Sequence, residues 1–148
     1  MPVCREYSAG RRWLDRLPHG CDLIPTLEGL CDRHHIQAAV FSLIGAVSKA
    51  TLGTYDQRQQ VYVTFQREGH LEILSCLGNV SLKDGKPFVH AHVVLAAEGG
   101  QTVGGHLFSE TILFAGEVHL LELTGPSLMR KYDQTTGLML WETDAFGG

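Results

Sequence analysis

The chain has 148 residues, of which 44% are hydrophobic and 19% charged, a length and composition typical of one globular domain. Two catalytic lobes, a long repeat array and a disordered chain are thereby excluded. The formal net charge of −4 means that any binding of nucleic acid would need a local basic patch. We expect a single domain over residues 1–148, with a core over 12–142 and a loose tail over 143–148.

The first predicted elements are a strand over residues 12–17, where apolar and polar residues alternate, and a helix over residues 22–34. Pro18 and Gly20 separate them. Asp22 is a suitable N-cap for the helix. The apolar residues of this segment recur at helical spacing and predict its buried face: Leu23, Ile24, Leu27, Leu30 and Cys31.

Beyond the helix, the pattern is that of short strands joined by turns. Gly45 is expected to end the first of these strands, and Asp84-Gly85, Gly99-Gly100 and Thr136-Gly137 are turn signals. The pattern therefore predicts an α+β fold, with a mostly antiparallel sheet or barrel-like core and one main flanking helix. Strands are predicted over residues 36–43, 50–55, 61–65, 71–77, 88–97, 111–114, 118–123 and 138–141.

The cysteines indicate neither a metal ribbon nor a redox motif. Cys4, Cys21, Cys31 and Cys76 form no CxxC pair. Cys76 lies within a predicted strand and is interpreted as a core residue rather than a nucleophile. The sequence shows no signal peptide and no apolar run of about 20 residues, so we expect a cytoplasmic protein with no membrane partner.

Three of the eight histidines form a pattern that suits a metal ion. His90 and His92 lie two residues apart in a predicted strand, so both side chains project to one face, about 6.6 Å apart. The turn at Gly99-Gly100 reverses the chain and is expected to bring His106 beside them. Three imidazoles with an open fourth position are typical of an accessible zinc site. The alternative is a cross-strand cluster of surface histidines without a metal.

The neighbours of these histidines indicate how the site is built. The opposite face of the strand is predicted to be core, whereas the histidine face continues as Val94 and Ala96. We expect that apolar continuation to be covered by another part of the fold or by a neighbouring subunit. Gly104-Gly105 is expected to let the backbone pass close to a ligand pocket beside His106, the alternative being a bulge without a ligand.

Several segments closely resemble the PPC (plants and prokaryotes conserved) domain, and the resemblance extends from Arg12 to Trp141. It implies a homotrimer in which His90, His92 and His106 bind zinc, as in prokaryotic members. The domain is also similar in fold to α-acetolactate decarboxylase, which holds zinc through an HxH pair and a later histidine. The segments that carry the resemblance are GHLEILSCLG at 69–78, DGKPFVHAH at 84–92, GGHL at 104–107 and Glu117.

Three functions remain open at this point. The first is a trimeric module that binds zinc or another divalent metal and whose output is an interaction with a small molecule or a protein. The second is DNA binding, the label that the family often carries. The third is a zinc-dependent lyase or hydrolase related to the decarboxylase, with catalytic residues unknown. Glu72, Glu117 and Arg130 match the carboxylates and arginine of that enzyme by residue type only.

DNA binding is not favoured by the sequence. Plant members carry an AT-hook with an Arg-Gly-Arg-Pro core, which does not occur in this chain. The arginines of the N-terminal segment supply the only dense group of basic residues, and this group is small. Its members are Arg5, Arg11, Arg12 and Arg16.

Overall fold

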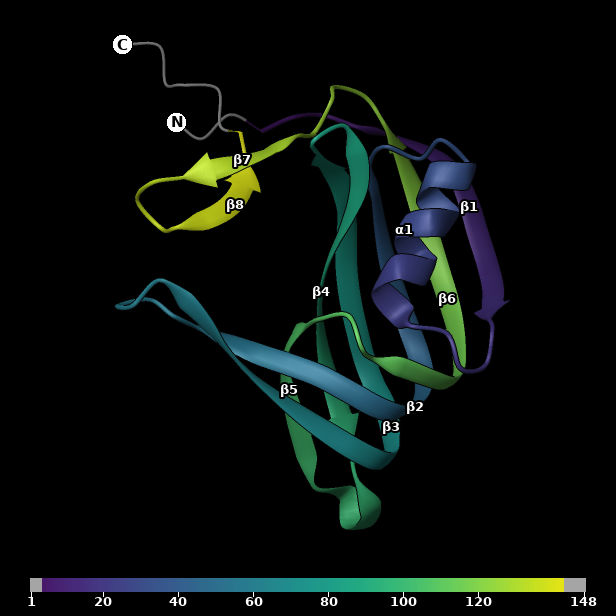
Figure 1. Cartoon of the computed structure of the whole chain (residues 1–148). Coiled ribbons are helices and arrows are strands. Elements are labelled where there is room, and N and C mark those ends of the chain that lie inside the picture. The colour runs from purple at the N-terminus through teal and green to yellow at the C-terminus, as the bar shows by residue number, and fades with distance from the viewer. Residues whose placement is uncertain (1–3, 143–148) are drawn as a thin grey trace.

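Six strands form one antiparallel sheet in the computed structural model, which describes residues 4–142 (Figure 1). The remaining two strands pair only with each other, as a hairpin of β7 (Arg130–Asp133) and β8 (Leu138–Trp141). The order across the large sheet is β1 (Ser8–Leu17), β6 (Ile112–Thr124), β2 (Ala39–Asp56), β3 (Val61–Lys83), β4 (Lys86–Ala96) and β5 (Thr102–Leu107).

The sheet is mostly antiparallel and carries one helix, as predicted, but it is not a closed barrel. At one end, β1 pairs with β6 alone and forms an edge. At the other end, β5 pairs with β4 and also touches β2 through Leu52–Leu107 and Gly53–His106. The far halves of β2 and β3 bend away from β1 as a long ribbon, so they reach β5 and leave the β1 edge open (Figure 1).

The predicted helix is confirmed as α1 (Leu23–Arg33), which covers one face of the sheet (Figure 1). Leu23, Leu27 and Cys31 are fully buried against that face. Asp22 precedes the helix with an extended backbone, but its carboxylate does not cap α1. It accepts hydrogen bonds from the backbone N–H groups of Glu110 and Thr111, at 2.7 and 3.4 Å, and so ties the start of α1 to the loop before β6.

The prediction that Gly45 ends a strand is wrong. β2 continues through Gly45, with a register shift against β3 between Leu43 and Gly45. A Cβ on Gly45 would lie 2.1 Å from the backbone oxygen of Ala115, and its φ is +145°. This glycine therefore permits a close approach of two strands inside the sheet rather than a turn. In the same way, the strands predicted at 61–65 and 71–77 are one strand, as are those at 111–114 and 118–123.

The core lies between the inner face of the sheet and α1. In β4, every second side chain from Val89 to Leu95 is buried, as predicted, with exposures of 4% or less. Asp84 and Gly85 both have positive φ and form the turn between β3 and β4. The predicted tail, 143–148, lies outside the described residues. Over 4–142, no helix is long and apolar enough to cross a membrane.

Candidate metal centre

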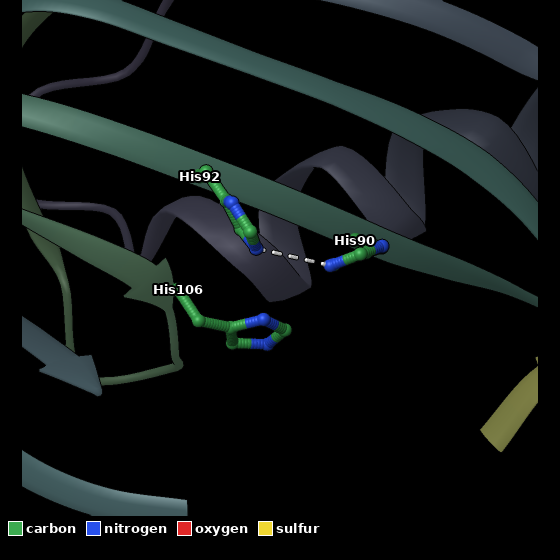
Figure 2. Close-up of side chains that lie close together, drawn as sticks. All are labelled: His90, His92 and His106. Carbon is green, nitrogen blue, oxygen red and sulfur yellow. Dashed lines mark hydrogen bonds between the residues drawn. The ribbon is translucent and has the colours of Figure 1, made fainter. Parts of the chain in front are cut away.

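The three predicted histidines meet on the outer face of the sheet, opposite α1 (Figure 2). His90 and His92 project from β4, away from the buried side chains of the same strand. His106 lies on β5 directly across from His92, its partner in the β4–β5 register. Side chains in such a pair have Cβ atoms about 4.5–5.5 Å apart, so the pairing alone brings the third imidazole to the other two.

The distances between the imidazoles suit a single ion. The Nε2 atoms of His90 and His92 are 3.3 Å apart, the contact drawn in Figure 2. The candidate ligand atoms of all three histidines lie within 4.8 Å of one another. Two nitrogens each about 2.0–2.1 Å from a tetrahedral zinc ion would be about 3.3 Å apart. The separation of His90 and His92 therefore matches two nitrogens on one ion, and the ligand atom of His106 lies within 4.8 Å of both.

Burial keeps two of the rings uncharged. Loss of hydration lowers the pKa of His90 to about 4, helped by the positive charge of Arg130 and by His92. The pKa of His106 is also lowered to about 4, first by burial and then by the other two histidines and Arg130. Both rings therefore present free lone pairs at neutral pH, the form that a metal requires.

An aromatic group surrounds His106. The Tyr62 hydroxyl lies 3.4 Å from His106 Nδ1, and the ring centroids of Tyr62 and Phe108 are 4.8 and 4.7 Å from that of His106. A partner at Nδ1 leaves Nε2 as the nitrogen that can face a metal, the usual arrangement around metal-binding histidines. No sequence pattern indicates Tyr62, because it lies 44 residues from His106 and meets it only through the bend of β3.

The histidines line an open pocket of about 780 Å³, whose other walls include Tyr62, Leu77 and Val94. Within the described chain nothing buries Val94, which is 42% exposed. The expectation that another part of the same chain covers this face is therefore wrong for the described residues, which leaves a neighbouring subunit as the expected cover. A smaller cavity of about 300 Å³ adjoins His90 and His106, and its lining also includes Tyr62, Phe108 and Arg130.

Gly104 and Gly105 both line the larger pocket, and they also have a packing role. A Cβ on Gly104 would lie 2.8 Å from the backbone oxygen of Val93, and one on Gly105 would lie 2.8 Å from that of Gly53. The register of β4 with β5 runs from Ala96–Thr102 to His92–His106 without a shift, so the bulge alternative is wrong. The glycines let β5 approach two strands closely, and this approach sets the position of His106.

Of the three residues that match the decarboxylase by residue type, one lies near the histidines and two lie away from them. Arg130 lines the smaller cavity together with His90 and His106. Glu72 and Glu117 line neither of the two cavities that contain the histidines. Cys76 is buried in the core, and burial raises the pKa of its thiol to about 12, which agrees with a packing role.

The basic segment is weaker than its sequence indicates. The Nε of Arg11 donates to Glu122 Oε2 at 2.7 Å, and its Nη2 donates to the backbone oxygen of His34 at 2.8 Å. One of the four arginines is therefore already paired with a carboxylate. Arg12 and Arg16 lie exposed on β1.

Comparison with known proteins places this geometry among relatives. A family model for the Plants and Prokaryotes Conserved (PCC) domain matches residues 4–124. A metal-containing protein from Archaeoglobus fulgidus is 45% identical with a TM-score of 0.90, over 95% of this chain and 99% of that one. A plant- and prokaryote-conserved (PPC) protein from Pyrococcus horikoshii is 38% identical with a TM-score of 0.91, over 95% and 96% of the two chains.

Two further relatives have descriptions that mention neither a metal nor the PPC family. A "putative DNA-binding protein" from Ralstonia eutropha JMP134 is 28% identical with a TM-score of 0.77, over 87% of this chain and 89% of that one. The bifunctional protein GlmU from Synechococcus sp. (strain JA-3-3Ab) is 34% identical over 126 residues, which are 84% of this chain and 19% of that protein. The chain thus spans about a fifth of the length of the curated relatives it matches.

Proposed function

Because the chain belongs to the Plants and Prokaryotes Conserved (PCC, or PPC) domain family, we propose that it is a metal-binding member in which His90, His92 and His106 hold one zinc ion. The convergence of three imidazoles from two paired strands is the observation that carries this proposal. The 45% identity to a metal-containing protein supports it.

Zinc is the proposed metal because of the donor set. Three neutral imidazoles suit zinc better than magnesium or calcium, which prefer oxygen ligands. When bound, zinc would supply a Lewis acid with an open position for water or a small ligand. The open pocket in front of the histidines leaves room for that position.

We favour a binding role over the alternative of a zinc-dependent lyase or hydrolase. No Asp or Glu of residues 4–142 lines either cavity beside the histidines, so the carboxylate that would serve as a general acid or base is missing there. The Tyr62 hydroxyl contacts His106, and burial raises the pKa of this hydroxyl, which makes it a poor base at neutral pH.

We also propose that the protein is a homotrimer whose subunits cover the outer face of the sheet. The β-pairings place one row of residues across this face, from β1 to β5. The row contains Leu77, which is 62% exposed, and Val94 and Ile44 lie exposed on nearby strands. Exposed apolar side chains grouped on a sheet face are typical of subunit contacts. The members of the row are Leu14, His119, Ser42, Leu77, His92 and His106.

DNA binding is the second candidate, and one relative's description favours it. The chain offers little for it, since Arg11 is paired with Glu122 and the net charge is −4. We therefore place it below the metal-binding role.

The test is metal analysis of protein prepared without chelators. We expect about one zinc ion per chain, and we expect His90→Ala and His106→Ala to lose it. His70→Ala is the matched control, because His70 is an exposed histidine of β3 outside the cluster. Wild-type protein that holds no metal after exposure to stoichiometric zinc would refute the proposal, as would a control variant that loses zinc equally.

A further inference from the structure

Arg130 is a buried cation whose observed hydrogen-bond partners are all uncharged. Only 7% of the surface of Arg130 is exposed. Its Nε donates to Ser81 Oγ at 2.9 Å, Nη1 to the backbone oxygen of Met139 at 3.0 Å, and Nη2 to Asn79 Oδ1 at 3.0 Å. Among the described residues, no carboxylate is paired with it. A guanidinium has five N–H groups, so these bonds leave two of them available.

The partners of Arg130 fix it next to the histidine cluster. Asn79 pairs with His90 across β3 and β4, and Ser81 pairs with Phe88. The guanidinium carbon lies 5.3 Å from the ring centroid of Phe88, which shares a strand face with His90. A second ring, Trp141, lies 5.4 Å from the same carbon. The guanidinium therefore contacts two aromatic rings, and its hydrogen-bond partner Asn79 pairs directly with His90.

Arg130, His90 and His106 line the same cavity of about 300 Å³. A buried charge without a counter-charge is unfavourable, and three neutral imidazoles cannot neutralise a divalent ion. A metal held by His90 and His106, and by His92, which lines the larger pocket, would place a second positive charge beside this cavity, whose lining contains no acidic side chain of the described chain. The missing partner is therefore an anion.

We propose that this cavity binds a small carboxylate, whose oxygens lie between the Arg130 guanidinium and the metal held by His90, His92 and His106. This inference rests on the metal site proposed above. One guanidinium with two free N–H groups matches the two oxygens of a carboxylate in bidentate geometry. The other walls include Tyr62, Phe88 and Phe108, which suit a small organic body rather than a bare inorganic ion.

The test uses the whole chain loaded with Co²⁺, whose visible spectrum reports the ligands of the metal. Metal content is measured first. Glycolate is then titrated in, with ethylene glycol as the uncharged analogue and inorganic phosphate as the competing class of anion. For wild-type protein we expect a saturable spectral change with glycolate, none with ethylene glycol, and a weaker response to phosphate.

Arg130→Met is expected to weaken glycolate binding at least about tenfold while the cobalt content stays the same, since a hydrogen-bonded charge is lost. Arg130→Lys keeps the positive charge but lacks the paired donors of a guanidinium, so its glycolate affinity should fall between those of wild type and Arg130→Met. It serves as the test variant if Arg130→Met does not fold. Lys131→Met is the matched control, because it removes an exposed cation of the same strand, β7, that lines neither cavity. Its affinity should stay within about threefold of wild type.

The outcomes separate the two proposals. Wild-type protein that retains no cobalt refutes the metal site, and the carboxylate site with it. Full cobalt content with equal glycolate affinity in wild type and both Arg130 variants refutes the carboxylate site alone. Tighter Arg130-dependent binding of phosphate than of glycolate also refutes the assignment to a carboxylate.

Discussion

At the scale of single residues, the site depends on keeping imidazoles uncharged and close together. Burial and the nearby Arg130 both disfavour protonation of His90 and His106. These two imidazoles are therefore neutral donors with free lone pairs at neutral pH. A group of solvent-exposed histidines would be partly protonated near their ordinary pKa of 6.5. The surrounding structure therefore favours metal binding over a charged surface cluster.

The negative charge of Glu122 stabilises the fold. We predict that neutralising this charge lowers the melting temperature in a pH-dependent way. The hydrogen bonds from Arg11 lower its pKa from 4.5 to about 2. Because the folded pKa is the lower one, the carboxylate stabilises the fold above about pH 4.5, and this contribution is lost as the pH falls towards 2. Glu122→Gln should therefore melt at a lower temperature than wild type at pH 7, and the difference should vanish near pH 2.

Thermal melts followed by circular dichroism between pH 7 and pH 2 measure this difference. Glu68→Gln is the control, since Glu68 is an exposed carboxylate of β3. Its melting temperature should follow that of wild type throughout. Identical curves for Glu122→Gln and wild type at pH 7 would contradict the prediction.

The sequence predicted the three histidines but not their surroundings. The two-residue spacing of His90 and His92 implies a shared face, and the length of the return from the turn brings His106 to the pair. Tyr62 and Arg130 come from segments whose position depends on the bend of β3 and on the β7–β8 hairpin. Arg130 is a sequence candidate by residue type alone, and nothing in the local sequence of either residue indicates which strand face it meets.

At the scale of elements, glycines explain where the strand predictions failed. In a sequence, a glycine between strand patterns predicts a turn. This prediction is confirmed at Gly85 and Gly137, which have positive φ and lie between paired strands. Gly45 and Gly78 instead lie inside long strands, where a Cβ would meet backbone or ring atoms closer than 2.8 Å. Such contacts join residues far apart in the chain, so sequence spacing alone cannot reveal them.

We predict that Gly105→Ala impairs metal binding through the position of β5. The added Cβ would lie 2.8 Å from the backbone oxygen of Gly53, next to the short pairing that joins His106 to β2. β5 must then shift, and disturbing the groups that orient a metal ligand typically costs about 10–100-fold in affinity. A zinc titration against a competing chelator measures the change.

The control for this prediction is Gly29→Ala. Gly29 lies in α1, and a Cβ there would meet nothing within 4 Å. This substitution should leave zinc affinity unchanged and raise the free energy of unfolding by up to about 1 kcal/mol, because alanine favours a helix more than glycine does. If Gly105→Ala binds zinc as tightly as Gly29→Ala, β5 does not depend on this close approach.

At the scale of the whole molecule, the outer face of the sheet combines an apolar surface with the histidine pocket. Leu77 and Val94 line the pocket that contains His90 and His92. Subunits that cover this face would therefore border the metal site as well. Assembly and metal binding would then share one surface, and a change on it should act on both.

We predict that the wild-type protein forms trimers and that Leu77→Glu dissociates them. Leu77 lies in the middle of the exposed row, 62% exposed, and a buried glutamate at a subunit contact would be strongly unfavourable. Light scattering coupled to size exclusion should give three chain masses for wild type and one for the variant. Tyr132→Glu, at an equally exposed site on the β7–β8 hairpin, should remain trimeric. A wild-type monomer at micromolar concentration would contradict the prediction.

The last prediction concerns DNA, the second candidate function. Binding to phosphates needs clustered cations and weakens steeply with salt, whereas this molecule has a net charge of −4 and an Arg11 already paired with Glu122. We therefore expect no sequence-dependent gel shift of duplex DNA at near-physiological salt. At low salt we expect only weak binding that Arg12→Ala combined with Arg16→Ala removes, because those two arginines are exposed on β1 and, unlike Arg11, are not paired with Glu122. A saturable, sequence-dependent shift at submicromolar protein would favour the DNA-binding role instead, and its persistence in the double variant would place the contact away from β1.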